Sequence, residues 1–153
     1  MLSQTESDGY RNSSGFKNNN LNINLFKKVN NDTNYGLNFN YVDSPFAIDP
    51  GGLTIDEVNK NRKQARERNL TYASKESIKH FKLSGNFEKK LTEKLTFSNY
   101  IFYSNRNFDG NIPVKKGGAI KLKRKYWGLG ASILIKNSIT TQIGFDIGNQ
   151  KDF

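Results

Sequence analysis

The chain has 153 residues, enough for one domain, and its mean hydropathy of −0.75 is low for a domain that buries a compact core. Its 11 Phe and 7 Tyr exclude an intrinsically disordered composition and fit β-strands with one polar and one apolar face. The formal charge of +10 favours anionic partners, while the absence of cysteine excludes disulfides, Cys-based metal sites and Cys nucleophiles.

The first third of the chain predicts one weak strand and one hairpin. Residues 2–10 form the weak strand and lead into a polar run at residues 11–15. Apolar residues then alternate with asparagines at 21–25, and again after the turn signal Asn30-Asn31-Asp32 at 35–41. This period of two is typical of strands with one apolar face, joined here by a tight turn.

Residues 49–69 form the longest interruption of this pattern. Pro50-Gly51-Gly52 is a turn signal, and Thr54 followed by Glu57 fits the capping box of a short helix. Five basic residues give that helix a basic end: Lys60, Arg62, Lys63, Arg66 and Arg68. The last four, Arg62, Lys63, Arg66 and Arg68, are our candidate ligand-binding residues of the loop. A helix with so little apolar face does not build a core, so we expect a structured, solvent-facing loop on a β scaffold.

Alternation resumes after this loop and continues to the end of the chain. The apolar runs lie at residues 81–87, 95–103, 120–135 and 139–147. Two irregularities interrupt them: Asn99 stands on the apolar parity while Tyr100 and Phe102 stand on the polar one, and the parity changes near Arg124. A β-bulge is one explanation for the first irregularity.

The order of the connections predicts the architecture. Tight turns near residues 30–32, 89–93 and 136–138 alternate with long connections at 49–69 and 105–118. In an up-and-down meander this places the tight turns at one end and the long loops at the other, as in outer-membrane barrels. Predicted strands of about 9 to 12 residues also suit a tilted membrane strand. We therefore predict an all-β, antiparallel up-and-down meander of about seven strands, a partial transmembrane β-barrel.

The two predicted faces fit a membrane setting. The polar face is rich in amide and hydroxyl side chains suited to a wet lumen, and the centres of the apolar faces carry no Lys or Arg. Lys27 lies beside a turn, where its stem can reach the headgroups. Tyr and Trp near strand ends fit an aromatic girdle: Tyr35, Tyr41, Tyr72 and Trp127. A soluble antiparallel sandwich or barrel shows the same alternation and remains the alternative.

Several short motifs carry a family resemblance. They are Ser7-Asp8-Gly9-Tyr10-Arg11 with Ser14, Pro50-Gly51-Gly52-Leu53-Thr54 with residues 64–69, and the stretch at residues 117–130. In their order and spacing they resemble the early barrel of TonB-dependent outer-membrane receptors, particularly those for ferric siderophores. The terminal Phe153 is treated as a chance match to the last residue of such barrels.

The resemblance implies a fragment of a larger protein. Receptors of this family have a barrel of about 22 strands that is filled by an N-terminal plug. We therefore expect residues 1–153 to be a partial barrel domain without the plug and the remaining strands, and a targeting segment to lie outside the chain. The implied location is the bacterial outer membrane. The implied partners are a ferric siderophore or other anionic chelate, the TonB energy-coupling complex through the missing plug, and outer-membrane lipid or lipopolysaccharide.

Candidate chemistry is sparse. The single histidine, His80, has no second histidine to share a metal, and Asp56 and Glu57 are explained by the dipole of the predicted helix. We expect no enzymatic activity, catalytic residue, metal or cofactor. The basic residues of the 49–69 loop could attract an anionic ferric chelate, pair with lipopolysaccharide phosphates, or only be solvated. The alternatives for the whole chain are a soluble ligand-binding β-barrel and a basic nucleic-acid-binding protein, and we favour no nucleic-acid partner.

Overall fold

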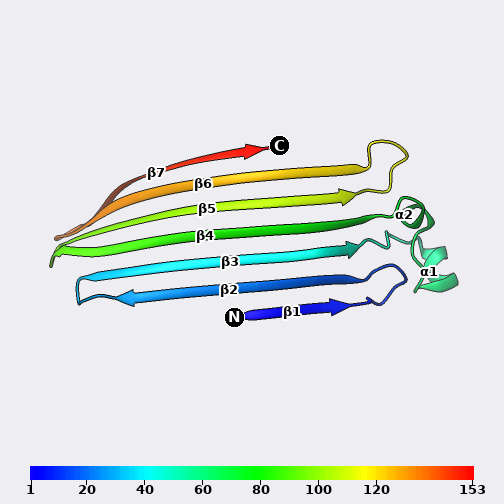
Figure 1. Ribbon diagram of the computed structural model, residues 1–153, viewed down its shortest axis with the longest axis horizontal. Coiled ribbons are helices and arrows are strands. Elements are labelled where there is room, and N and C mark those ends of the chain that lie inside the picture. Colours follow the sequence, from blue (N-terminus) through cyan, green and yellow to red (C-terminus); the bar gives the residue numbers. More distant parts are fainter. The chain divides into compact units, whose positions relative to one another are not determined.

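A computed structural model describes residues 1–153 and shows seven strands that follow one another in a single sheet (Figure 1). The strands are β1 (Leu2–Ser7), β2 (Phe16–Lys28), β3 (Thr33–Ile48), β4 (Lys75–Thr92), β5 (Leu95–Asn111), β6 (Ala119–Lys136) and β7 (Thr140–Asp152). Two short helices, α1 (Ile55–Asn61) and α2 (Glu67–Thr71), lie between β3 and β4. The predicted antiparallel meander is confirmed, with one more helix than the sequence indicated.

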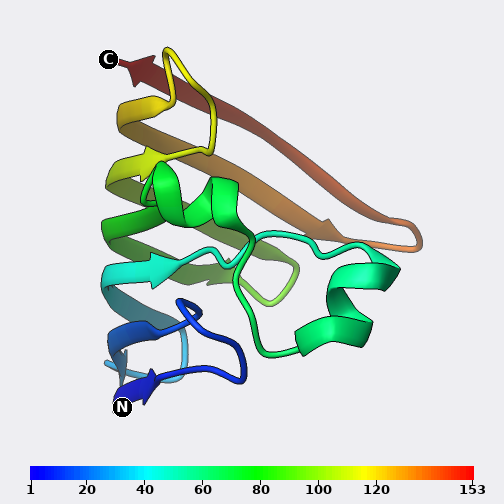
Figure 2. The ribbon, with the colours of Figure 1, turned by 90° about the vertical axis from the view of Figure 1, so that its right-hand side faces the viewer.

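The chain divides into two compact units. Unit 1 comprises Met1–Leu21, Tyr41–His80 and Arg106–Lys123, and unit 2 comprises Asn22–Asn40, Phe81–Asn105 and Arg124–Phe153. Figure 2 draws the long connections at residues 8–15, 49–74 and 112–118. All of these connections belong to unit 1. All tight turns, at residues 29–32, 93–94 and 137–139, belong to unit 2. The predicted alternation of tight and long connections is therefore present. The change of parity near Arg124 falls where β6 passes from one unit to the other.

All strands but β1 are longer than the sequence pattern predicted, and β1 ends at Ser7, short of the predicted residues 2–10. β2 and β7 have 13 residues and β3 to β6 have 16 to 18. Residues 105–111, which we expected in a connection, extend β5. A strand continues wherever its backbone groups find ladder partners, even where the side chains are polar on both faces. Alternation of side chains therefore marks only part of each strand.

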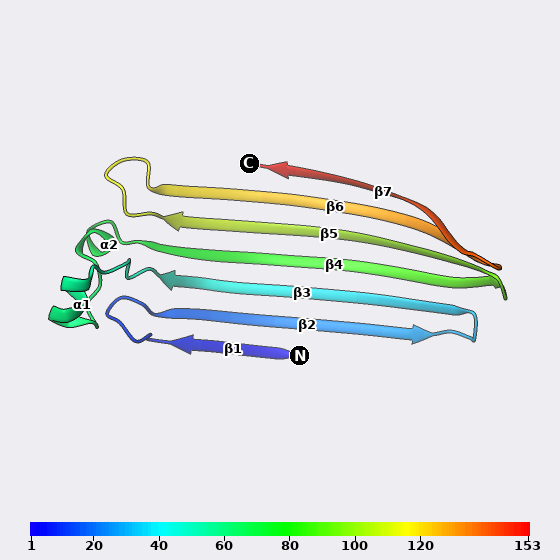
Figure 3. The ribbon, with the colours of Figure 1, turned by 180° about the vertical axis from the view of Figure 1, so that it is seen from behind.

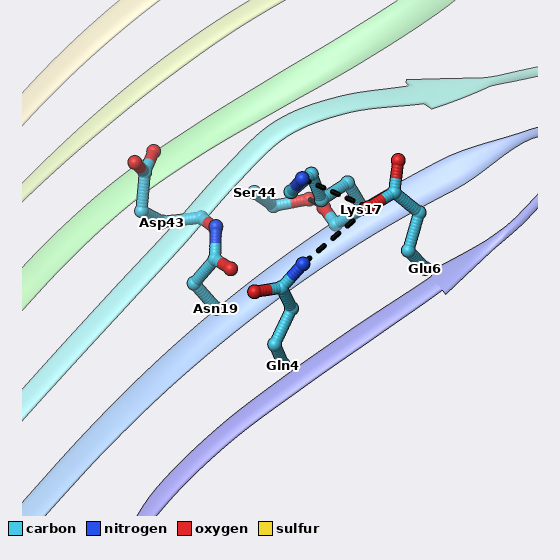
Figure 4. A network of polar contacts seen from close by, with 6 residues as sticks. All are labelled: Gln4, Glu6, Lys17, Asn19, Asp43 and Ser44. Atoms are coloured by element: carbon cyan, nitrogen blue, oxygen red, sulfur yellow. Dashed lines mark hydrogen bonds and ion pairs between the residues drawn. The ribbon is translucent and has the colours of Figure 1, made fainter.

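In unit 1, the β1–β2 pair carries a network of polar side chains (Figure 4). Glu6 lies opposite Lys17 in the antiparallel register, and the Lys17 ammonium is 2.8 Å from the Glu6 carboxylate. Gln4 also donates to Glu6, and the Ser44 hydroxyl donates to the Lys17 carbonyl. This part of unit 1 is therefore held by paired charges and amides.

In unit 2, β6 and β7 pair in a regular register from Arg124↔Asp152 to Lys136↔Thr140 (Figure 3). One face of this pair carries Leu129 opposite Ile147 and Ile133 opposite Ile143. Aromatic pairs continue this apolar face on the neighbouring strands of unit 2: Tyr35–Phe87, Phe87–Phe97 and Phe81–Tyr103. The opposite face carries mainly polar residues and glycines, together with a few aromatic side chains. The two faces of unit 2 therefore differ sharply in polarity.

Tyr100 and Phe102 lie on the polar face of unit 2, where they cover glycines of β6. A Cβ added at Gly128 would lie 2.7 Å from the Phe102 ring, and one added at Gly130 would lie 2.5 Å from the Tyr100 ring. β5 runs unbroken through both aromatic residues. The irregular parity of this strand therefore reflects aromatic rings seated over glycines, and the bulge considered from the sequence is not required.

Almost no hydrophobic side chain is buried. Ala65 is the one buried hydrophobic residue, and no large side chain is fully enclosed. On β7, Ile143, Phe145 and Ile147 are 55 to 65% exposed. Unit 2 therefore presents a broad apolar surface outward instead of enclosing it.

No helix in the structure has the length and apolar character needed to cross a membrane.

Candidate functional site

The β3–β4 loop, residues 49–74, carries the basic residues singled out in the sequence. It begins with a turn in which the Gly51 N–H donates to the Asp49 carboxylate at 2.9 Å. Gly51 has a φ of 71°, a conformation that side chains with a Cβ rarely adopt. A Cβ at this position would also lie 2.4 Å from the Asn69 amide oxygen. Position 51 therefore requires glycine for two reasons, the positive φ of its backbone and the close approach of the Asn69 side chain.

The first helix of the loop begins with the predicted capping box. The Thr54 N–H donates to the Glu57 carboxylate at 2.7 Å, and the Glu57 N–H donates to the Thr54 hydroxyl at 3.3 Å. The hydrogen bond from the Thr54 backbone holds the pKa of Glu57 below its ordinary value, and the charges of Arg66 and Lys60 add to this lowering. The helix ends at Asn61, earlier than its predicted basic end. Arg66 instead precedes α2, and Arg68 lies within it.

Arg11 of the β1–β2 connection fixes the loop from outside. Its guanidinium donates to the carbonyl of Gly51 at 2.6 Å, to that of Pro50 at 3.2 Å, and twice to that of Gln64 at 2.8 and 2.9 Å. The Asn12 N–H donates to the Lys63 carbonyl nearby. A planar guanidinium with five donors suits this convergence of three carbonyls, which a lysine could not reproduce. One side chain thus joins both ends of α1 to another connection.

The end of the loop closes on its beginning through buried polar groups. Asn69 and Ser74 are each 4% exposed, and both donate side-chain hydrogen bonds to the Asp49 carboxylate, at 2.8 and 3.2 Å. The Asp49 N–H donates in turn to the Ser74 carbonyl at 3.0 Å. The loop is therefore a folded element stabilised mainly by polar contacts.

The four predicted basic residues all lie on the surface of this folded loop. Arg62, Lys63, Arg66 and Arg68 are exposed, and none belongs to an ion pair. The Lys63 ammonium lies 5.9 Å from the centre of the Tyr10 ring, a cation–π contact. The structure does not gather the four side chains around one cavity. They form a dispersed positive surface on a rigid support.

A second polar feature lies in unit 2 and was not singled out in the sequence. A hollow of 480 Å³ on its polar face is lined by residues that include Glu88, Ser132 and Gln142. Within it the Tyr100 hydroxyl donates to the Asp146 carboxylate at 2.7 Å. Tyr100 and Asp146 are 46 residues apart, and no spacing rule in the sequence could have brought them together.

Comparison with known proteins gives a likeness of fold. No family model matches the chain. The crystal structure of the ferric citrate transporter FecA, in its unliganded form, superposes with a TM-score of 0.81 and 18% sequence identity. The match covers 97% of this chain and 23% of the FecA chain. The fold of this chain is therefore that of a segment of FecA, and the chain spans about a quarter of the length of FecA.

Proposed function

We propose that this chain is part of the β-barrel of a bacterial outer-membrane receptor that imports a ferric siderophore or a similar iron chelate. The observation that carries the proposal is a seven-stranded meander with an exposed apolar face and the fold of a FecA segment. Exposing an apolar surface such as that of Ile143, Phe145 and Ile147 to water is unfavourable. Moving one such side chain from water into an apolar environment stabilises the protein by ~1.5–3 kcal/mol. Bilayer hydrocarbon removes that cost.

The remainder of the transport machinery belongs to the whole receptor. Residues 1–153 supply a partial barrel in this proposal, and a plug with the other strands completes it. The plug would contact the TonB energy-coupling complex. In this proposal the chain has a supporting role in the outer membrane and carries no catalytic residue or cofactor.

Within this receptor we assign the basic loop to electrostatic attraction of the anionic chelate. Arg62, Lys63, Arg66 and Arg68 are exposed and unpaired by carboxylates, so their field reaches into solvent. Arg11 and the Asp49 turn hold the loop in place, which keeps the charges in position at little entropic cost on binding. Such attraction raises the association rate and weakens with salt over a Debye length of about 8–10 Å.

The test uses the complete receptor encoded around this chain, in outer-membrane vesicles. Replacing all four basic residues by glutamine should slow association of a ⁵⁵Fe-labelled anionic chelate by about tenfold at low ionic strength and much less at high salt. A control with the same change in charge replaces Lys27, Lys28, Lys89 and Lys90, which lie beside the tight turns of unit 2. Equal effects of both sets, or no salt dependence, would contradict the assignment. Failure of the unmodified receptor to bind any ferric chelate would contradict the function itself.

A further inference from the structure

A groove of 390 Å³ crosses the apolar face of unit 2. Its lining includes Leu37, Leu83, Gly85, Ile101, Tyr103 and Trp127. These residues come from β3, β4, β5 and β6, and none of the six carries a charge. The groove is therefore a hollow that suits a hydrocarbon chain.

Gly85 helps to form this hollow. A Cβ added there would meet only the Gly36 carbonyl at 3.8 Å and the Ile101 side chain at 3.9 Å, both ordinary contact distances. The methyl group of an alanine would thus fit at this position, and glycine leaves its volume open. By contrast, the glycines on the polar face at positions 128 and 130 are already covered by aromatic rings.

Two lysines lie on the same face of the sheet, one step along the strands from Trp127. Lys125 and Lys151 are directly opposite each other in the β6–β7 register, next to the Trp127↔Asn149 pair. Like charges directly opposite one another destabilise a pair of strands. The two acidic residues of β7 offer no compensation, because Asp146 and Asp152 lie opposite Gly130 and Arg124 on the other face. Lys125 has a cation–π contact with Phe153, and both ammonium groups remain exposed.

We infer that this face binds a phosphate-bearing membrane lipid, with one acyl chain in the groove beside Trp127 and the phosphate between Lys125 and Lys151. The inference rests on the proposed membrane location. The anionic headgroup removes the repulsion between the opposed lysines, and the acyl chain fills the space left by Gly85. A second copy of this chain is a poorer occupant, since a symmetric contact would bring two further lysines to the same place.

Trp127 provides the measurement, because it is the only tryptophan in the chain and lines the groove. The chain is refolded into dioleoylphosphatidylcholine vesicles that contain a small fraction of phosphatidylglycerol or phosphatidylcholine with brominated acyl chains. We expect brominated phosphatidylglycerol to quench Trp127 fluorescence at a lower mole fraction than brominated phosphatidylcholine does. The mole fraction needed for half-maximal quenching should be lower by roughly 5-fold for each of the two lysines. The preference should decline as salt is added.

In the double variant Lys125→Gln/Lys151→Gln, both brominated lipids should quench Trp127 fluorescence equally. The control Lys28→Gln/Lys136→Gln lowers the net charge equally and should keep the preference, with circular dichroism verifying the fold of each protein. Quenching of the unmodified chain without preference, or a preference retained by Lys125→Gln/Lys151→Gln, would overturn the site alone. Absence of quenching by either lipid would contradict the membrane location together with the site.

Discussion

The two units of this chain are stabilised by different kinds of contact. In unit 1, polar side chains make the contacts: Arg11 donates to three backbone carbonyls, and the Asp49 carboxylate accepts from the Gly51 N–H and from the Asn69 and Ser74 side chains. In unit 2, the contacts are ladder pairs, aromatic pairs and rings seated over glycines. The comparison shows that the loops of unit 1 are ordered by polar contacts of their own, whereas the strands of unit 2 leave an apolar surface exposed.

Removing the Arg11 side chain is the strongest test of polar anchoring. We expect Arg11→Ala to speed hydrogen exchange of the Asn12 and Arg66 amides about 100-fold, roughly 3 kcal/mol, because hydrogen bonds to a charged group contribute ~1.5–3 kcal/mol. Both amides bond to carbonyls within the anchored region. Arg106→Ala, which removes an exposed arginine of β5, is the control. Unchanged exchange in Arg11→Ala would show that the loop holds itself together.

The glycines of unit 2 test the second kind of contact. Gly130→Ala places a Cβ 2.2 Å from the Asp146 carboxylate and 2.5 Å from the Tyr100 ring, and it should lower the free energy of unfolding by about 2 kcal/mol, the cost of overpacking. The same substitution at Gly85 meets only ordinary contacts and should change stability by less than ~0.5 kcal/mol. Urea midpoints of both variants in detergent micelles provide the measurement. Similar losses at the two positions would mean that the hydrogen-bonded Tyr100 and Asp146 side chains do not pack over Gly130.

The capping box tests whether unit 1 is anchored at many points or mainly at Arg11. Thr54→Ala removes the hydroxyl that accepts from the Glu57 N–H and should destabilise α1 by ~1 kcal/mol. Exchange of the Val58 amide, which donates to the Thr54 carbonyl, reports the opening of this helix. Thr54→Ser, which keeps the hydroxyl, should behave as the unmodified chain. A loss that spreads to the Asn12 amide would show that the helix and the Arg11 anchor open together.

The smallest effect is expected from pH. Hydrogen bonding from the Thr54 backbone lowers the pKa of Glu57 in the folded state. Because the pKa of Glu57 is lower in the folded than in the unfolded state, its carboxylate stabilises α1 fully at pH values above the unfolded pKa of about 4.5. This stabilisation is lost as the pH falls through the lowered pKa of the folded state. The effect is small because this carboxylate is exposed. Nuclear magnetic resonance titration of Glu57 should give a midpoint below 4.5, and Glu57→Gln should remove the pH dependence of α1. A midpoint at or above 4.5 would contradict the prediction.

Much of the fold follows from local sequence, because strands and caps depend on neighbouring residues. Alternation from Leu21 to Leu25 and from Phe81 to Phe87 predicts strands, and the spacing of Thr54 and Glu57 predicts the cap. Residues 105–111 were misassigned because ladder partners, which lie on other strands, decide where a strand ends. α2 was merged with α1 because both are polar and no glycine or proline separates them.

The candidate site was predicted less completely than the fold. The four basic residues were found because their charge is visible in the sequence, and the structure confirms only that they are exposed. The anchoring role of Arg11 depends on contacts 39 to 53 residues away, and the Tyr100–Asp146 pair on one 46 residues away. Contacts at such separations arise from the register of the sheet, which a single sequence does not specify.

The Arg11 anchor also bears on how this loop can evolve. Arg11 binds the carbonyls of Pro50, Gly51 and Gln64, atoms that every amino acid supplies. Exposed positions such as Arg62 and Arg68 can therefore mutate without disturbing the contacts that fold the loop. Among descendants of this sequence, positions 11, 51 and 69 should stay fixed while the loop surface diversifies. In the receptor that we propose, selection could then favour a new ligand without rebuilding the scaffold of the loop.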